Sequence, residues 1–446
     1  MKRKTMLLAR TLVGLLLFSV MNCGGGGGGD LTAPTVVSTM PAADAVAVET
    51  NAAVAASFSK TIDDSTLTAS SFTVAHSGTN AAGTISYTDT TFTGTFTSVN
   101  SLALLTPYTA TLTTAIADAA GNALAADYSW NFMTRDGVWG TAETIETDDA
   151  GDAASPQIAF DPSGNAISVW HQSDGVRNNI WSNRYTAGTG WGTAIKIETD
   201  DAGHAMAPQI AFDPSGNAIS VWHQSDGTRN NIWSNRYTAG TGWGTAIKIE
   251  TDDAANATFP QIAIDSGDSA ISVWVQSDGV LTNIWANRYT AETGWGTAEK
   301  IETNDAGFAE APQIAFDPSG NAISVWQQSD GAWFHIWSNR YTAGTGWGTA
   351  MKIEIDEAAD AQEPEIAIDS AGNAIVVWWL SDGTRTNIWA NRYAAESGWG
   401  TAAKIETDDT ADAESPKVAV DSGGNAISVW KQSDGTLFNI LANRFE

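Results

Sequence analysis

One phrase recurs through most of this chain, and it limits the fold more than any other feature. The string QIAFDPSGNAISVWHQSDG occupies residues 157–175 and returns unchanged at residues 209–227. Looser copies begin at Gln261, Gln313, Glu365 and Lys417. Trp-Gly pairs mark the same spacing, each starting 52 residues after the one before, at Trp139, Trp191, Trp243, Trp295, Trp347 and Trp399. A repeat of this length without helical periodicity predicts the blades of a β-propeller, in which each unit buries its faces against its neighbours.

Each repeat divides into four segments with strand character. In the first full repeat these are PQIAF at 156–160, AISVWHQ at 166–172, NIWSNRYT at 179–186 and WGTAIKIET at 191–199. Gly and Asn fill the turns, where a positive φ is easy for them. The second segment is apolar or small on both faces, as a strand between two neighbouring blades requires. The fourth segment alternates, as a half-exposed outer strand does.

The repeated aromatic and basic side chains have a structural explanation. Trp170 and Trp181, with their counterparts in the other repeats, are predicted to pack between blades rather than to form ligand platforms. The arginine of the recurrent NRY segment, Arg184 in the first repeat, is predicted to join one blade to the next through hydrogen bonds.

The phase of the array predicts how it closes. The array opens with a lone fourth segment, WGTAETIET at 139–147, and stops after a third segment, NILANRFE at 439–446. Pairing these two segments would complete the last blade, whereas an open solenoid gives no reason for such complementary ends. The sequence therefore predicts an all-β chain in which residues 139–446 form a six-bladed β-propeller of 52-residue blades with a strand-swapped closure.

A separate domain precedes the repeats, from residue 33 to residue 134. Short alternating stretches in a Thr-, Ala-, Ser- and Val-rich sequence, such as AAVAASF at 52–58, predict a β-sandwich. The segments APTVVSTMPAADAVAV, SFSKTIDDSTL and LTPYTATLTTAIADAAGNALAADYSWNFMT follow one another here. With DAAGN at 118–122 and WNFMT at 130–134, they resemble the bacterial Ig-like domains of the S-layer SbsA type. The resemblance implies an Ig-like β-sandwich that serves as a spacer or adhesion module.

Residues 1–23 carry an export signal. A basic start, MKRK, is followed by an apolar stretch at 12–21 that is too short to span a bilayer. The single cysteine, Cys23, precedes a run of glycines. This resembles the signal of a bacterial lipoprotein, although Asn22 stands where that pattern usually has Gly, Ala or Ser. The resemblance implies lipid attachment at Cys23, a flexible tether at 24–32 and a place in the cell envelope, at the outer membrane or cell surface. An ordinary cleaved secretory signal is the alternative, and it also implies export.

The charge of the chain excludes one class of partner. Asp and Glu number 51 against 22 Lys and Arg, which gives a formal net charge of −29. Because such an acidic surface repels the phosphate backbone of nucleic acids, we expect no nucleic acid partner. It suits cations or basic partners, or it serves solubility alone. We expect the propeller to be monomeric.

Two sets of acidic residues are predicted to share one face, because the loops after the second and fourth strands leave from the same end of a blade. The SDG loops contribute Asp174, Asp226, Asp278, Asp330, Asp382 and Asp434. The loops after the fourth segment contribute acidic pairs, and the candidate metal ligands among them are Asp148, Asp149, Asp200, Asp201, Asp252 and Asp253. Carboxylate oxygens suit Ca²⁺ better than a transition metal. Since the loops lack the spacing of a tight calcium loop, we expect weak Ca²⁺ binding or none.

The differences between repeats fall on the same face. The residues after SDG vary and bring Arg177, Arg229, Arg385, Trp333 and Phe334 to it. The loop before the first strand reads GDAAS, GHAMA, ANATF, GFAEA, ADAQE and ADAES through the six repeats, and the residue after the VW pair changes too. Variable loops on a rigid repeated scaffold commonly bind ligands, so we predict a ligand face made of the SDG aspartates and these five residues. Loops that drift without constraint are the alternative.

Two functions from different classes fit these residues. Near-identical blades supply copies of a weak site rather than one asymmetric constellation, and the histidines lack zinc-ligand spacing. SDGVRNNIW departs from the sialidase S-x-D-x-G-x-x-W box, and the catalytic residues of sialidases cannot be placed, so that resemblance is architectural. We therefore predict a non-catalytic binding and adhesion module with a glycan or a cell-surface protein as its ligand. A sialidase-like glycan-processing enzyme is the alternative. A non-repeated polar cluster at the mouth of the channel would favour it, and the sequence reveals none.

Overall fold

The computed structural model describes residues 30–147, 151–200, 202–251, 255–303, 306–355, 359–407, 411–421, 423–434 and 436–446. Over these residues the chain is built from strands, with two 3-10 turns at Asp64–Thr66 and Asp89–Thr91. No helix within these ranges is long and apolar enough to cross a membrane. The chain divides into two compact units, one ending at Ala142 and the other running from Glu143 to Glu446. Both units are all-β, as predicted.

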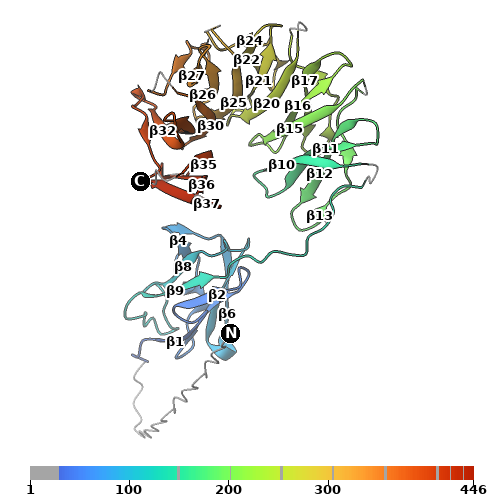
Figure 1. The fold of residues 1–446 in the computed structure, drawn as a ribbon. Coiled ribbons are helices and arrows are strands. Elements are labelled where there is room, and N and C mark those ends of the chain that lie inside the picture. Colours follow the sequence, from blue (N-terminus) through green and yellow to red (C-terminus); the bar gives the residue numbers. More distant parts are fainter. Residues whose placement is uncertain are drawn as a thin grey trace, which may run out of the picture. The chain divides into compact units, whose positions relative to one another are not determined.

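The first unit is a sandwich of two sheets (Figure 1). One sheet has the strand order β1 (Val36–Met40), β3 (Val54–Phe58), β7 (Thr93–Ser98), β6 (Gly83–Thr88). The other has the order β2 (Ala45–Val48), β9 (Tyr128–Thr134), β8 (Pro107–Leu112), β4 (Phe72–His76), β5 (Thr79–Asn80). Phe58 and Phe96 from the first sheet meet Phe72, Trp130 and Phe132 from the second in one buried core. The alternating residues predicted from the sequence to form strands are therefore side chains that point alternately into and out of the core.

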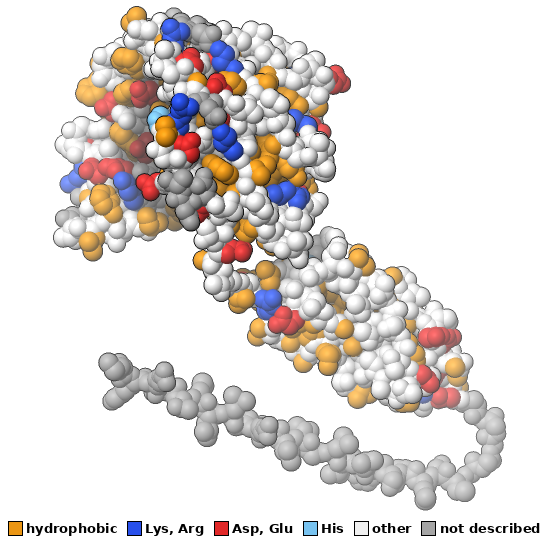
Figure 2. Space-filling view, turned by 90° about the vertical axis from the view of Figure 1, so that its right-hand side faces the viewer, with side chains coloured by type: hydrophobic (Ala, Val, Ile, Leu, Met, Phe, Trp, Pro, Cys, Tyr) orange, Lys and Arg blue, Asp and Glu red, His pale blue; other side chains and the backbone are white. Residues whose placement is uncertain are grey.

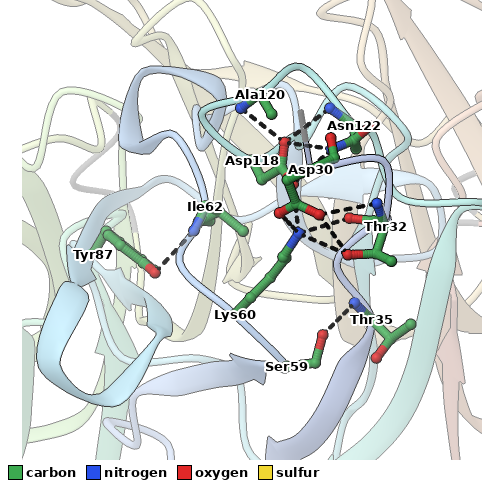
Figure 3. Close-up of polar contacts among 10 residues, drawn as sticks. All are labelled: Asp30, Thr32, Thr35, Ser59, Lys60, Ile62, Tyr87, Asp118, Ala120 and Asn122. Atoms are coloured by element: carbon green, nitrogen blue, oxygen red, sulfur yellow. Dashed lines mark hydrogen bonds and ion pairs between the residues drawn. The ribbon is translucent and has the colours of Figure 1, made fainter. Parts of the chain in front are cut away.

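The DAAGN segment at 118–122 takes part in a network of hydrogen bonds with Asp30 and Lys60 (Figure 3). The buried carboxylate of Asp118 accepts backbone N–H groups from Ala120 and Asn122, at 3.0 and 2.9 Å, and the Lys60 ammonium at 2.8 Å. The Asn122 amide donates back to Asp118 and also to the Asp30 carbonyl oxygen, at 2.8 Å. These hydrogen bonds, the Asn122 amide first and then Lys60, hold the pKa of Asp118 well below its usual range. These contacts fix the turn at 118–122 and join it to Asp30, which precedes the first strand of the sandwich.

The second unit consists of six sheets over its described residues, numbered here from sheet 1 to sheet 6 in chain order. Their long strands are β10 (Ala153–Phe160), β11 (Ala166–Ser173) and β12 (Asn178–Thr186); β15 (Ala205–Phe212), β16 (Ala218–Ser225) and β17 (Asn230–Thr238); β20 (Ala257–Ile264), β21 (Ala270–Ser277) and β22 (Thr282–Thr290); β25 (Ala309–Phe316), β26 (Ala322–Ser329) and β27 (Phe334–Thr342); β30 (Ala361–Ile368), β31 (Ala374–Ser381) and β32 (Thr386–Ala394); and β35 (Ala413–Val420), β36 (Ala426–Ser433) and β37 (Phe438–Phe445). Within each sheet these strands are antiparallel neighbours.

The predicted fourth strand is shorter than expected. It forms two brief pairings on the outer side of the third strand, at β13 (Gly190–Trp191) and β14 (Ile195–Lys196), β18 (Gly242–Trp243) and β19 (Ile247–Lys248), β23 (Gly294–Trp295) and β24 (Glu299–Lys300), β28 (Gly346–Trp347) and β29 (Met351–Lys352), and β33 (Gly398–Trp399) and β34 (Ala403–Lys404). Over the described part of the chain, sheet 6 comprises only its three long strands.

A β-bulge interrupts the first strand of every sheet. In β10 the register shifts between Ala154 and Gln157, and Ser155 between them has a positive φ. Its counterparts Ala207, Phe259, Ala311, Glu363 and Ser415 share this conformation, with φ between 51° and 55°. The bulge precedes Pro156, which has no N–H to give to the ladder, so the extra residue lets the strand continue past the proline.

The six sheets lie side by side in chain order along an arc, with their first strands on the inner side (Figure 1). The side chains of Trp170 and its counterparts are buried between sheets, which confirms their predicted packing role. Arg184 also reaches the next sheet as predicted, but through a different contact. Its guanidinium lies over the Tyr237 ring, 5.9 Å from the ring centroid, and therefore makes a cation–π contact in place of the expected hydrogen bonds.

The predicted strand-swapped closure is not formed in this structure. Residues 139–147 contain no strand, and β37 forms the free edge of sheet 6. Ile158 and Phe160 at one end of the arc and Ile427 and Ile440 at the other are exposed. The pairing joins segments about three hundred residues apart, so no local contact enforces it.

Candidate functional site

The loops predicted to form the ligand face lie at one end of the six sheets. The second strand of each sheet ends at an SDG loop, and the first strand begins beside that end, since Ala154 pairs with His171 in sheet 1. In Figure 2, the acidic side chains on the visible face of the second unit are mixed with Lys and Arg and do not form one continuous acidic patch.

The SDG aspartates shape their own loops. In sheet 1, the Asp174 carboxylate accepts the backbone N–H groups of Val176 and Arg177, each at 2.8 Å, and the Asn179 amide at 3.2 Å. These hydrogen bonds, that of Arg177 first, lower the pKa of Asp174 to about 2. Hydrogen bonds also lower the pKa of its five counterparts. The largest effect comes from a threonine hydroxyl for Asp226, Asp382 and Asp434, and from a backbone N–H for Asp278 and Asp330. These aspartates therefore stabilise their own loops, and their role in ligand binding stays a prediction.

The other predicted contact residues lie around the same loops. Trp333 is 41% exposed, and Phe334 is half-buried with its backbone N–H donated to Asp360 at 2.9 Å. Arg229 and Arg385 are exposed, and Arg177 is half-buried.

Most of the candidate metal ligands cannot be placed. Asp148, Asp149, Asp201, Asp252, Asp253 and the lipidation candidate Cys23 lie outside the described residues. Asp200 is described, and its carboxylate accepts the backbone N–H of Ala202 at 2.9 Å. Across the described ranges, no group of three or more His, Cys, Asp or Glu side chains could hold a metal ion.

A polar cluster that the sequence did not reveal lies at the start of the inner strands. Glu310, Glu363 and Glu414 belong to the first strands of sheets 4, 5 and 6. The aligned positions of sheets 1 to 3 hold no carboxylate: they read Ala154-Ser155, Met206-Ala207 and Thr258-Phe259. We call Glu310, Glu363 and Glu414, with Gln327 and Lys431, the axial cluster. It breaks the repeat on one side of the array only.

Within the axial cluster, hydrogen bonds join sheets 4 and 5, and an ion pair lies within sheet 6. The Glu414 carboxylate lies 2.9 Å from the Lys431 ammonium, its cross-strand partner. Gln327 receives the backbone N–H of Glu363 at 3.0 Å and places its amide nitrogen 3.5 Å from the Glu310 carboxylate. Glu414 raises the pKa of Lys431, and Glu363 acts in the same direction to a smaller extent. Lys431 therefore stays charged between two carboxylates from different sheets.

A second polar row lies further along the same strands. Gln313, Glu365 and Lys417 occupy one position in sheets 4, 5 and 6. The Gln313 amide donates to Glu365 at 3.4 Å, and Lys417 forms an ion pair with the same carboxylate. Since sheets 1 to 3 carry glutamine at this position, the asymmetry of the axial cluster continues along the inner strands.

The sequence did contain a signal for this cluster. The strings GFAEA, ADAQE and ADAES hold its three glutamates, but they read as loops because a strand was expected to begin at the proline that follows. The structure places these residues inside the strand. Glu310 and Glu414 precede the bulge and face Gln327 and Lys431 in the ladder, and Glu363 is the bulge residue of its strand.

Comparison with known proteins covers both units. Residues 30–134 match the family described as bacterial Ig-like domain. Similar solved structures include an α-L-arabinofuranosidase from Fusarium graminearum (12% identity, 66% of this chain and 93% of that one, TM-score 0.42). They also include an ulvan-type polysaccharide lyase (10%, 68% and 80%, TM-score 0.46) and an intramolecular trans-sialidase from Ruminococcus gnavus (10%, 66% and 94%, TM-score 0.42). The search of curated proteins gives no match.

These comparisons correct one prediction. The similar structures are glycan-processing enzymes, which contradicts the expected non-catalytic binding and adhesion module and agrees better with the alternative, a glycan-processing enzyme. At such identities and TM-scores the similarity assigns this chain neither an activity nor a substrate.

Proposed function

We propose that this protein is a glycan-processing enzyme that cleaves glycosidic bonds at the axial cluster. One observation carries the proposal: three carboxylates stand at the same end of three adjacent inner strands, on sheets 4 to 6, and one of them, Glu414, is paired with Lys431. Glycoside cleavage needs two carboxyl groups on either side of the bond, and a repeated scaffold supplies such a pair only where the repeat is broken.

The contacts of the two carboxylates that act on Lys431 suggest different roles for them. The Glu414 carboxylate lies 2.9 Å from the Lys431 ammonium, and we assign to it the role of base or nucleophile. The side chain of Glu363 is exposed at the start of the neighbouring inner strand, within reach of a bound substrate, and we assign to it the general acid that protonates the leaving oxygen. Glu310, held by Gln327, and Trp379, at the position of Gln327 and Lys431 on sheet 5, would contact sugar hydroxyls and a sugar face.

The SDG face extends this site outward. Trp333 and Phe334 border it on sheet 4, with Arg177, Arg229 and Arg385 on other sheets, and we assign to them contacts with the outer residues of a glycan chain.

The test is activity of the purified full chain on a panel of polysaccharides and oligosaccharides, followed as new reducing ends and as ultraviolet absorbance of unsaturated products. Glu363→Gln and Glu414→Gln should each lower kcat by roughly a hundredfold or more while the protein stays folded. Glu292→Gln is the matched control, because Glu292 is exposed in the loop after β22, away from the axial cluster. Full activity in both axial variants would refute the site.

We further propose that the six sheets are the blades of one six-bladed propeller and that the chain is exported and held in the cell envelope by lipid on Cys23. The polyglycine run after Cys23 and the Ig-like match at residues 30–134 support this location. Cys23→Ser should move the protein from the membrane fraction to the soluble fraction without changing its thermal unfolding. An unchanged membrane fraction would refute the anchor.

A further inference from the structure

Neighbouring sheets among the first five are joined by interfaces of one kind, and each interface contains a tryptophan from the short fourth segment. Between sheets 1 and 2, Trp243 lies edge-on to Tyr237 with ring centroids 5.7 Å apart. Its indole N–H donates to the Ser182 hydroxyl of sheet 1 at 3.2 Å. Trp295, Trp347 and Trp399 pack in the cores of the next three interfaces. The fourth segment of a sheet therefore helps to bind that sheet to the one before it.

Among the described residues, the interface between sheets 5 and 6 holds no counterpart of this tryptophan, since sheet 6 comprises β35, β36 and β37. A cavity of about 240 Å³ lies there, lined by Val377 and Ala390 from sheet 5 and by Ser428 and Phe445 from sheet 6. Phe445 stands where Tyr237 stands in sheet 2, and it is 45% exposed. The buried core of this interface is also split into two small clusters.

Trp139 is a copy of the missing tryptophan. It begins the lone segment WGTAETIET, 52 residues before Trp191, and its side chain is fully exposed. Ala142 in the same segment is exposed as well, whereas its counterparts Ala194 and Ala246 are buried. Burial of a fully exposed indole contributes a large favourable hydrophobic free energy, so pairing of this segment with an apolar surface is favoured.

The other end of the segment already lies as a fourth segment does. The Asn183 side-chain amide donates to the Ile145 carbonyl oxygen at 2.7 Å, just as Asn235 donates to Ile197 at 2.8 Å. The Gln172 amide lies 3.3 Å from the Glu146 carboxylate, and the corresponding pair between sheets 3 and 4 has a distance of 3.1 Å. Residues 145 and 146 therefore sit on sheet 1 as the end of a preceding sheet would.

We propose that residues 139–144 pair with β37 and that Trp139 fills the cavity between sheets 5 and 6, which closes the six sheets into a ring. In the other sheets, Trp191 pairs with Tyr185 and Ile195 with Ser182, so the same register pairs Trp139 with Phe445 and Glu143 with Ala442. The occupant is the chain's own segment, because one end of it is already anchored on sheet 1.

Closure also covers the two free apolar faces. Between sheets 2 and 3, Ile219 and Ile232 pack against Ile262 and Ile264. The counterparts at the ends of the array are Ile427 and Ile440 on sheet 6, and Ile158 and Phe160 on sheet 1, all of them exposed. A closed ring brings these two sets together. The proposal is independent of the enzymatic activity proposed above.

Disulfide trapping in the full chain tests the occupant. In a Cys23→Ser background, Glu143→Cys with Ala442→Cys should lose both thiols on air oxidation and remain a monomer in non-reducing electrophoresis. The matched control is Glu143→Cys with Ala286→Cys, which occupies the same strand position on sheet 3 and should keep both thiols free. A disulfide-linked dimer would assign the cavity to a second copy, and free thiols in the test pair would leave the segment unpaired; either result overturns the proposal.

Thermal unfolding gives a second measurement. Trp139→Ala should lower Tm by roughly 5–10 °C, because the indole is buried in the closed ring. Val138→Ala, an exposed neighbour, should leave Tm unchanged. Equal Tm values for Trp139→Ala and the unaltered chain would overturn the proposal.

Discussion

The backbone N–H of Glu363 donates to the side-chain oxygen of Gln327 at 3.0 Å, although the two residues belong to different sheets. Glu363 is the bulge residue of its strand and has a positive φ, a conformation that costs free energy in a residue with a side chain. The contact from Gln327 fixes this residue from outside its own sheet. A proposed general acid is thereby held by the neighbouring sheet.

Replacing Gln327 should loosen this carboxylate without disturbing the fold. Gln327→Val introduces the residue that sheet 3 carries at the same position, Val275. We expect kcat to fall roughly ten- to hundredfold with little change in KM, because misplacement of a catalytic group acts on the chemical step. The reciprocal variant Val275→Gln should keep full activity. Equal kcat values for Gln327→Val and the unaltered chain would show that Gln327 does not position Glu363.

Much of the fold could be predicted from the sequence because each strand and turn pattern occurs six times along the chain. The turns, the long second and third strands and the burial of Trp170 follow from apolar periodicity and turn residues, which act locally. The fourth strand was overestimated because only its beginning and its middle pair with the third strand, as β13 and β14 do.

The glutamates of the axial cluster are visible in the sequence, but their grouping depends on a strand that continues past the proline, and the proline predicts a strand start instead. A strand was expected to start at Pro156 and its counterparts, since proline gives no N–H to a ladder. The bulge at Ser155 instead carries the strand past the proline and adds residues before it. Glu414 and Lys431 are seventeen residues apart, and only this extended ladder makes them cross-strand neighbours.

His223 predicts a pH dependence of stability. Burial lowers the pKa of His223 to about 4, with a smaller effect from His171, and its ring nitrogen Nδ1 has no hydrogen-bond partner among the described residues. Between pH 6.5 and 4 the unfolded chain binds a proton that the folded chain does not, so the free energy of unfolding falls as pH falls through this window. The loss is on the order of 3 kcal/mol when complete.

The variant that tests it is His223→Gln, because Gln327 shows that glutamine fits this position in sheet 4. Urea unfolding at pH 7.5 and pH 4.5 should differ less for this variant than for the unaltered chain. The exposed His204, replaced by glutamine, serves as the control and should keep the full difference. If His223→Gln also keeps the full difference, the histidine is not the source of the pH dependence.

The SDG loops predict a second loss of stability at lower pH. Backbone hydrogen bonds lower the pKa of Asp174 and of Asp330 from 3.8 to about 2. A carboxyl group with a lowered folded-state pKa stabilises the fold above its unfolded pKa, and this stabilisation is lost as pH falls from about 4 to 2. Asp174 and Asp330 both titrate in this range, so acid unfolding followed by tryptophan fluorescence should steepen there. Asp174→Asn with Asp330→Asn keeps oxygen acceptors for the loop N–H groups but removes two titrating groups, so the transition should become shallower. Asp136→Asn, outside the repeats, is the control and should leave the slope unchanged. An unaltered slope in the double variant would mean that other carboxylates govern the acid transition.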